Sequence, residues 1–170
     1  YPEVLRRIES IIDKYGEVKD SASPELQDLR RKLKAAESSL SKKANAILKA
    51  AQEAGYADAD AGVNIRDGKY LIPISSANKK KVPGYVYDTS ATGKTSFVEP
   101  LEVIELENEI IDLRAKEVRE IEKILIAFSD FLRPYIPELL KAAAFVGELD
   151  FIMAKARTSM AYMAGMPIIS

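Results

Sequence analysis

Two long stretches with the spacing of amphipathic helices, separated by one short stretch with the pattern of β-strands, limit how this chain can fold. Across residues 24–54 and again across 101–135, apolar residues recur at intervals of three and four, which is the pattern of a helix with one buried face. Residues 63–100 instead alternate short apolar runs with turn residues. We therefore expect a mainly α fold with a small inserted antiparallel β module, in which the two long helices pack antiparallel as an arm.

Capping residues and prolines mark where the helices begin and end. Ser23 followed by Pro24 predicts a helix start, with Ser23 as the N-cap, and Gly55 predicts the end of that helix. A shorter helix is expected before it, over about residues 3–14, and Pro137 is expected to begin a final helix that runs to about residue 162. The apolar residues late in the second long helix have the heptad spacing of a coiled coil: Val118, Ile121, Leu125, Phe128, Leu132 and Tyr135.

The inserted segment contains four short strand candidates. Asp67-Gly68 lies between apolar runs and is a strong signal for a two-residue hairpin turn. Residues 88–95 end in Gly-Lys-Thr, as phosphate-binding loops do, but an aspartate stands where that motif has its first glycine. Strand-like residues then follow where the motif needs a helix, so these residues predict a polar hairpin turn. The expected division is 1–62 for the helical core and first long helix, 63–100 for the β module, and 101–170 for the second long helix and the return to the core.

The composition excludes several kinds of chemistry. The chain has no cysteine, histidine or tryptophan, which removes thiol nucleophiles, disulfides, thiolate or imidazole metal sites, and imidazole acid–base catalysis. The acids after residue 101 alternate with bases, as on a solvated helix face. We therefore predict no catalytic residues, no metal site and no small-molecule substrate.

The sequence also bears on location. No apolar run approaches the roughly 20 residues that a membrane span needs, so we expect a soluble chain with no membrane partner. The absence of cysteine suits a cytoplasmic protein. The start at Tyr1-Pro2 and an uncovered apolar stretch over residues 160–169 lead us to expect a piece of a longer protein.

Charge is balanced over the whole chain but unevenly distributed along it. There are 25 Lys and Arg against 26 Asp and Glu, a net charge of −1, so binding to nucleic acid by bulk charge is not expected. Residues 63–100, however, carry six basic against three acidic residues. These six are the candidate contacts to an anionic partner, such as a nucleic-acid backbone, and a merely solubilising loop is the alternative: Arg66, Lys69, Lys79, Lys80, Lys81 and Lys94.

Five segments resemble the central region of the MutS family. Residues 65–74, 82–93 and 97–100 are most similar to the second bacterial branch, whose members carry a C-terminal Smr nuclease domain. Residues 16–24 resemble the approach to the family's lever helix, and residues 149–156 resemble the core segment before its ATPase domain. The resemblance thus covers nearly the whole chain in the right order. One departure is Lys94, where a small residue is expected, and it adds charge to the module.

The resemblance implies a core and lever region, with the β module in the position of the family's DNA clamp. It implies that the whole protein is a homodimeric ATPase, with ATP and Mg bound in a domain absent from this chain and endonuclease activity in the Smr domain. Such proteins are implied to engage branched DNA, restrain recombination and act in DNA repair, or to bind ribosomes. The chain itself is then no enzyme and holds no cofactor, and it transmits ATP-driven motion to a basic tip that grips DNA or ribosomal RNA.

The heptad spacing supports a second hypothesis from a different class. A structural or dimerising coiled-coil spacer would use the same apolar residues and would make no nucleic-acid contact of its own. The salt dependence of nucleic-acid binding separates the two hypotheses, because it measures the number of phosphates that the protein neutralises.

Overall fold

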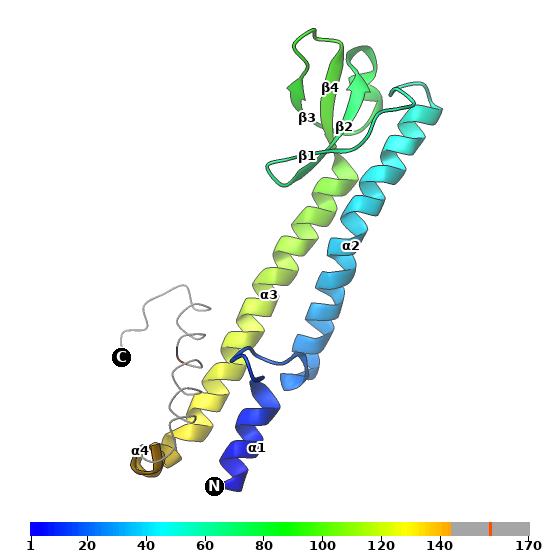
Figure 1. The fold of residues 1–170 in the computed structure, drawn as a ribbon. Helices are drawn as coiled ribbons and strands as arrows, with labels where there is room; N and C mark the ends of the chain where they lie inside the picture. Colours follow the sequence, from blue (N-terminus) through cyan, green and yellow to red (C-terminus); the bar gives the residue numbers. More distant parts are fainter. Residues whose placement is uncertain (144–156, 158–170) are drawn as a thin grey trace. The chain divides into compact units, whose positions relative to one another are not determined.

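The computed structural model describes residues 1–143 and residue 157. It confirms a mainly α fold with one inserted antiparallel sheet (Figure 1). Within this part of the chain, no helix has both the length and the apolar character that crossing a membrane requires. The elements in chain order are α1 (Pro2–Ile11), η1 (Asp20–Ala22), α2 (Pro24–Glu53), β1 (Asn64–Arg66), β2 (Lys69–Ser75), η2 (Ser76–Lys81), β3 (Gly84–Thr89), β4 (Thr95–Pro100), α3 (Leu101–Leu132), η3 (Arg133–Tyr135) and α4 (Ile136–Ala143).

The described residues form two compact units. The helical unit comprises residues 1–31 together with the described residues from 114 onward, and the sheet unit comprises residues 32–113. Helices α2 and α3 each contribute residues to both units. The predicted domain boundaries, 1–62, 63–100 and 101–170, were placed where helices change to strands and back, and not by compactness. This division stays a prediction.

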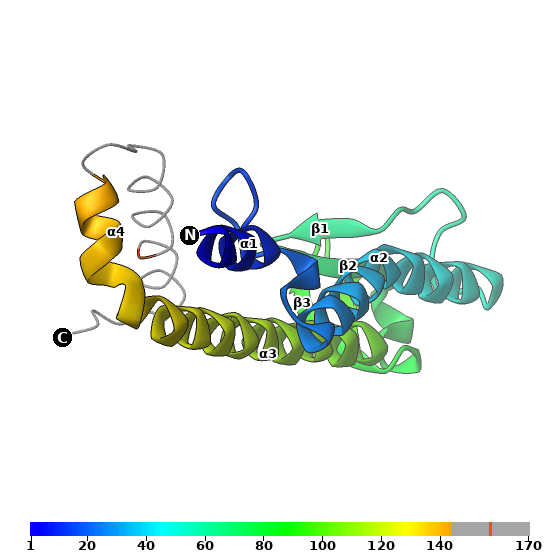
Figure 2. The ribbon, with the colours of Figure 1, turned by 90° about the horizontal axis from the view of Figure 1, so that it is seen from below.

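The core of the helical unit is built from α1 and the C-terminal half of α3, which lie side by side (Figures 1 and 2). The heptad positions Ile121, Leu125, Phe128 and Leu132 of α3 are buried in one cluster with residues of α1. The heptad spacing therefore predicted a buried face correctly, and α1 of the same chain packs against that face. The α1 members of the cluster are Val4, Ile8 and Ile11.

Helix α1 ends earlier than the sequence suggested. It was expected to reach about residue 14 but stops at Ile11, and Ile12 is extended and pairs with Val18. The Asp13 carboxylate accepts hydrogen bonds from the backbone N–H groups of Tyr15 (2.8 Å) and Glu17 (3.0 Å). A short acidic side chain that binds nearby backbone in this way favours a turn over a continuing helix.

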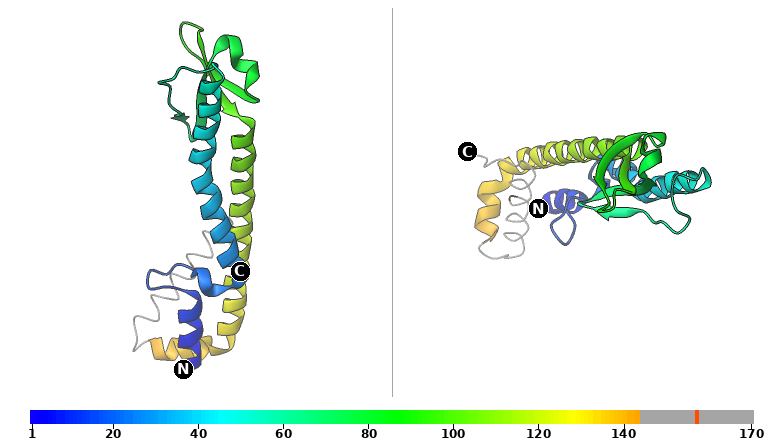
Figure 3. Two further views of the ribbon diagram at one scale, coloured as in Figure 1. Left: turned by 90° about the vertical axis from the view of Figure 1, so that its right-hand side faces the viewer. Right: turned by 90° about the horizontal axis from the view of Figure 1, so that it is seen from above.

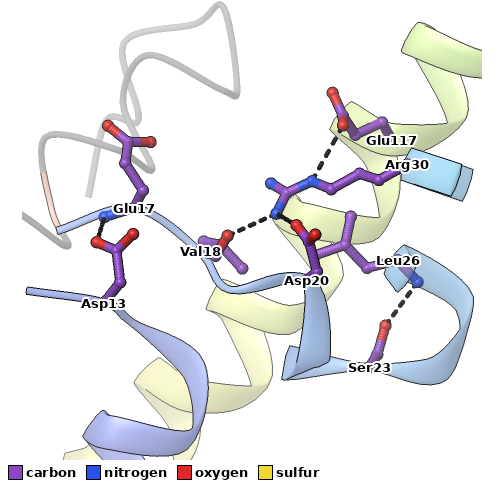
Figure 4. A network of polar contacts seen from close by, with 8 residues as sticks. All are labelled: Asp13, Glu17, Val18, Asp20, Ser23, Leu26, Arg30 and Glu117. Carbon is purple, nitrogen blue, oxygen red and sulfur yellow. Dashed lines mark hydrogen bonds and ion pairs between the residues drawn. The ribbon is translucent and has the colours of Figure 1, made fainter. Parts of the chain in front are cut away.

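Helix α2 begins where the capping residues predicted. The Leu26 N–H donates to Ser23 Oγ at 3.0 Å, and the Ser23 hydroxyl donates to Glu120 Oε1 of α3 at 2.9 Å. One turn further on, the Arg30 guanidinium donates to three acceptors around it (Figure 4). They are the Val18 carbonyl (2.7 Å), Asp20 (2.6 Å) and Glu117 (3.1 Å). Since Ser23 meets Glu120 and Arg30 meets Glu117, α2 and α3 run antiparallel in the helical unit.

The sheet has the strand order β1-β2-β4-β3 and is antiparallel throughout. All four predicted strands are present, and Asp67-Gly68 makes the predicted two-residue turn. Both turn residues have a positive φ (51° and 76°), as this tight hairpin requires. Strand β3 carries a register shift between Val86 and Asp88, so Tyr87 lies at a bulge.

One face of the sheet packs on the end of α2. Ile72, Ile74 and Val98 of the sheet form a buried cluster with Leu48 and Ala51 of α2. Figure 3 shows, within the sheet unit, the C-terminal part of α2 beside the N-terminal part of α3. The ion pair between Lys43 and Glu102 (3.2 Å) joins these two helical segments.

The chain changes direction at the end of α3. Helix α3 ends before Pro134, which lies in η3, and α4 starts at Ile136, one residue before the predicted start at Pro137, at a steep angle to α3 (Figure 2). The predicted continuation to about residue 162, the segment 149–156 and the apolar stretch 160–169 lie outside the described residues.

A substitution at Gly84 tests the close packing of β3 against β4. A Cβ at this position would lie 2.9 Å from Pro100 Cα and still closer to the Glu99 carbonyl oxygen. Because backbone atoms cannot move aside cheaply, Gly84→Ala should lower the free energy of unfolding by about 1–3 kcal/mol. Gly62→Ala is the control, since no atom lies within 4 Å of its Cβ, and it should stay within about 0.5 kcal/mol of the wild type. Urea unfolding measures both, and equal stabilities would contradict the close approach.

The Ser23 cap gives a second test. Ser23→Ala removes the hydrogen bond to Leu26 and the donor to buried Glu120, so it should lower the free energy of unfolding by about 1–2 kcal/mol. Ser38→Ala is the matched control, because Ser38 is exposed in mid-helix and alanine favours helix there. A thermal melt that fell equally for both variants would refute the capping role.

Candidate nucleic-acid interface

Three of the six predicted contact residues lie together on η2. Lys79, Lys80 and Lys81 are exposed, and no ion pair joins them to another residue of the described chain. The short helix that carries them is fixed at both ends. Asn78 donates to Ser75 Oγ at 2.8 Å, and Val82, which follows Lys81 directly, is buried in the core below the sheet.

Lys94 lies in the turn between β3 and β4, and the fold brings this turn to η2. The Ser76 N–H at the start of η2 donates to the Lys94 carbonyl at 2.9 Å. The hydroxyl groups of Ser76 and Ser96 share a further hydrogen bond of 3.0 Å. Lys94 is exposed and likewise has no acidic partner among residues 1–143. The start of η2 and Lys94 therefore lie together where β2 ends and β4 begins. From there η2 carries its three exposed lysines toward the start of β3, which pairs with the end of β4.

Arg66 is engaged within the protein. Its guanidinium forms an ion pair with Asp88 at 3.0 Å and lies over the Phe97 ring, 4.2 Å from the centroid. Next to it, the Tyr87 hydroxyl donates to Asp67, and this hydrogen bond is the largest of the effects that raise the pKa of Tyr87. These contacts tie the β1–β2 turn to β3.

Lys69 is also engaged within the protein. Its ammonium lies 3.5 Å from Glu99 Oε2, and the Glu99 side chain is only 5% exposed. A buried carboxylate needs a nearby cation, so Lys69 compensates a charge that folding removes from water. Nothing in the sequence pattern marked Glu99 as special. Its position between Val98 and Pro100 in a strand was the available signal, but an acid that follows an apolar strand residue is expected on the solvent face of the sheet.

Glu107 of α3 completes a buried acidic pair with Glu99. Glu99 Oε1 and Glu107 Oε1 are both buried, and as carboxylates they find no hydrogen-bond donor in the described part of the chain. A proton on Glu107 supplies that donor. Burial first, then the hydrogen bond to Glu99 and the charge of Glu99, raise the pKa of Glu107 to about 7, while Lys69 lowers it. Around neutral pH, the two acids therefore share a proton.

The six predicted residues accordingly divide into two groups. Lys79, Lys80, Lys81 and Lys94 are free to meet an anion, whereas Arg66 and Lys69 stabilise the module from within. Their contact with nucleic acid stays a prediction for all six. No group of three or more acidic side chains that could hold a metal ion occurs among the described residues.

These features define a class of protein region: long helices with an inserted four-stranded antiparallel sheet, with exposed lysines on η2 and on the β3–β4 turn. No protein-family model matches the chain. It is 39% identical over 168 residues to Endonuclease MutS2 of Pelotomaculum thermopropionicum and 37% identical over 169 residues to that of Lacticaseibacillus paracasei, each alignment covering 99% of this chain. Identity to Endonuclease MutS2 of Thermomicrobium roseum is 44% over 142 residues, or 84% of this chain.

The chain is therefore homologous, over nearly its whole length, to one region of Endonuclease MutS2. This confirms the resemblance to the second bacterial branch of the MutS family. The chain spans about a fifth of the length of these relatives, 21% for the first two and 18% for the third.

The buried acidic pair predicts a pH-dependent stability. Glu107 has a pKa of about 7 in the folded protein, above its ordinary value of 4.5, so folding strengthens its proton binding. Its contribution to the free energy of unfolding is complete below about pH 4.5 and is lost as the pH rises through about 7. Glu107→Gln keeps a donor for Glu99 and cannot ionise, so stability should fall less steeply between about pH 5 and 8, by at most about 1.4 kcal/mol per pH unit.

Urea unfolding across this pH range measures the effect. Glu109→Gln is the matched control, because Glu109 is exposed on the same helix, and it should leave the slope of the wild type unchanged. Identical slopes for the wild type and Glu107→Gln would show that the two acids do not share a proton.

Proposed function

We propose that this chain is the non-catalytic core, lever and clamp region of a MutS-type DNA-binding ATPase, and that its four exposed lysines grip a nucleic-acid backbone. The observation that carries the proposal is a set of four exposed lysines, all without acidic partners in the described chain: three on η2, and Lys94 on the β3–β4 turn that contacts the start of η2. Lysine ammonium groups bind phosphates as point charges and do not read base sequence.

The chemistry of this contact does not depend on the kind of nucleic acid. DNA and ribosomal RNA present the same backbone phosphates, so we propose branched DNA and the ribosome as alternative partners. Branched DNA is the first substrate to test, because the relatives are named endonucleases and recombination intermediates and repair sites contain such junctions.

The lever role is supported by how α2 and α3 are distributed. Each helix has residues in both the helical unit and the sheet unit. In the whole protein, ATP-driven motion in a domain outside this chain would act through these two helices on the module that holds the lysines. ATP hydrolysis, Smr nuclease activity and homodimer formation would reside in the other four-fifths of such a protein. This chain would hold the nucleic acid and transmit the motion to it, and it would catalyse no reaction.

The alternative of a dimerising coiled-coil spacer has less support. Its main evidence was the heptad face of α3, and Ile121, Leu125, Phe128 and Leu132 on that face are buried with α1 of the same chain. These residues are not available to a second chain without displacing α1. The spacer also gives no reason for the four exposed lysines on η2 and the β3–β4 turn.

The proposal predicts salt-sensitive binding to four-way-junction and duplex DNA. Changing Lys79, Lys80 and Lys81 to Ala removes up to three phosphate contacts. The slope of log affinity against log salt should therefore become shallower by up to about 2.7, with affinity reduced about tenfold or more at low salt. Fluorescence anisotropy with labelled DNA between about 50 and 200 mM salt measures both quantities.

A matched control separates a local grip from general charge. Lys14, Lys123 and Lys141 are exposed residues of the helical unit, and changing all three to Ala alters the net charge by the same amount. This variant should keep the wild-type slope. An equal loss in both triple variants, or no loss in the η2 variant, would rule out a specific grip by η2.

A further inference from the structure

A pocket of about 480 Å³ opens beside Lys94, where β2 ends and β4 begins. Small-molecule sites typically have volumes of about 300–1,000 Å³. The walls come from three separate segments of the sheet unit: the loop after α2 (residues 55–58 and Ala61), the end of β2 (residues 73–75) and the β3–β4 turn (Thr92, Lys94 and Thr95). This pocket includes most of the Gly-Lys-Thr turn that the sequence singled out and that the proposed grip does not explain.

Hydrogen bonds that involve backbone groups hold these three segments in place. The Ser75 N–H donates to the Tyr56 carbonyl at 2.9 Å and so joins β2 to the loop after α2. The Gln52 side chain donates to the carbonyls of Asp58 (3.0 Å) and Ala61 (3.1 Å), which fixes the same loop. The Thr95 N–H donates to Ser90 Oγ at 3.0 Å and closes the β3–β4 turn. The pocket is therefore preformed.

The lining combines three kinds of group. Lys94 supplies a cation without an acidic partner in the described chain, and the hydroxyls of Thr92 and Thr95 lie on the same turn. The lining also includes Asp58, which has a carboxylate, and two residues with rings, Pro73 and Tyr56, the latter packed partly against the core below the sheet. A pocket for inorganic phosphate would gain nothing from the carboxylate. A ligand with a phosphate, hydrogen-bond donors and a flat apolar ring uses all three.

We propose that this pocket binds a nucleotide that carries a terminal phosphate. Lys94 and the two threonine hydroxyls hold the phosphate, Asp58 accepts from a sugar hydroxyl or a base amino group, and the rings of Tyr56 and Pro73 lie against the base. The site differs from a phosphate-binding loop, because β4 and not a helix follows the turn. The nucleotide is either the phosphorylated end of a nucleic-acid strand, which rests on the proposed function, or a free mononucleotide.

The test is an NMR titration of the ¹⁵N-labelled 170-residue chain with thymidine 5′-monophosphate. Saturable shifts are expected for amides of residues 56–58 and 92–95. Thymidine and inorganic phosphate should each bind about tenfold more weakly or worse, since each lacks part of the recognised chemistry. No saturable shift with the monophosphate, or an equal response to thymidine, would overturn the proposal.

Variants assign the roles of the lining residues. Lys94→Met and Asp58→Ala change exposed positions, and each should weaken monophosphate binding about tenfold, because a hydrogen bond to a charged group is lost. Lys49→Met is the control, since Lys49 is exposed on α2 and does not line the pocket. Unchanged affinity in Lys94→Met would overturn the phosphate assignment, and dispersed spectra verify that each variant is folded.

Single-stranded oligonucleotides with 5′-phosphate, 3′-phosphate or only hydroxyl ends distinguish the two sources. Tighter binding of a phosphorylated end identifies a strand end as the ligand, and equal binding of all three together with monophosphate binding identifies a free nucleotide. The junction-DNA experiment with the η2 lysines reads out the proposed function separately. Junction binding that depends on η2, with no monophosphate binding, would overturn the pocket alone.

Discussion

The backbone amides of Ser75 and Ser76 hold together the end of the sheet at which Lys94 and the pocket lie. One N–H donates to the loop after α2, at Tyr56, and the next donates to the β3–β4 turn, at Lys94. Two consecutive residues thus connect segments about 20 residues apart on either side of them in the sequence. They bring the β3–β4 turn with Lys94 to the start of η2 and also set two walls of the pocket. A change in the backbone at this junction would disturb the exposed lysines and the pocket together.

Much of this architecture follows from local chemistry that the sequence displays. Ser23 caps α2 because its hydroxyl oxygen can accept from a free N–H of the first turn, and Asp67-Gly68 turns the chain because both residues tolerate a positive φ. Such features depend on a few neighbouring residues. The early end of α1 also has a local cause, the Asp13 side chain. The sequence predicted a longer helix because its apolar spacing was given more weight than this single turn-forming residue.

The partners of side chains depend on the tertiary fold and could not be predicted in the same way. The heptad spacing of α3 indicated a buried face, yet it is equally compatible with a helix from another chain and with α1, which occupies the face here. The six basic residues of the module look alike in the sequence. Arg66 and Asp88 belong to the two outermost strands, and only the tertiary fold brings them together. Likewise, only the fold brings Lys69 and Glu107 of α3 to the buried Glu99.

These side-chain partners change what the number of charged residues in the module implies about binding. Residues 63–100 contain three acids, and all three are engaged in contacts within the sheet unit. Asp67 accepts a hydrogen bond from Tyr87, Asp88 forms an ion pair with Arg66, and Glu99 forms an ion pair with Lys69. None of the three forms an ion pair with Lys79, Lys80, Lys81 or Lys94. The modest positive charge of the segment is therefore concentrated on Lys79, Lys80, Lys81 and Lys94. Screening limits electrostatic attraction to about 8 Å at physiological salt, so a phosphate backbone responds to this local group and not to the net charge of −1. A chain that is neutral as a whole can thus present a cationic contact, provided that the fold pairs its acids elsewhere.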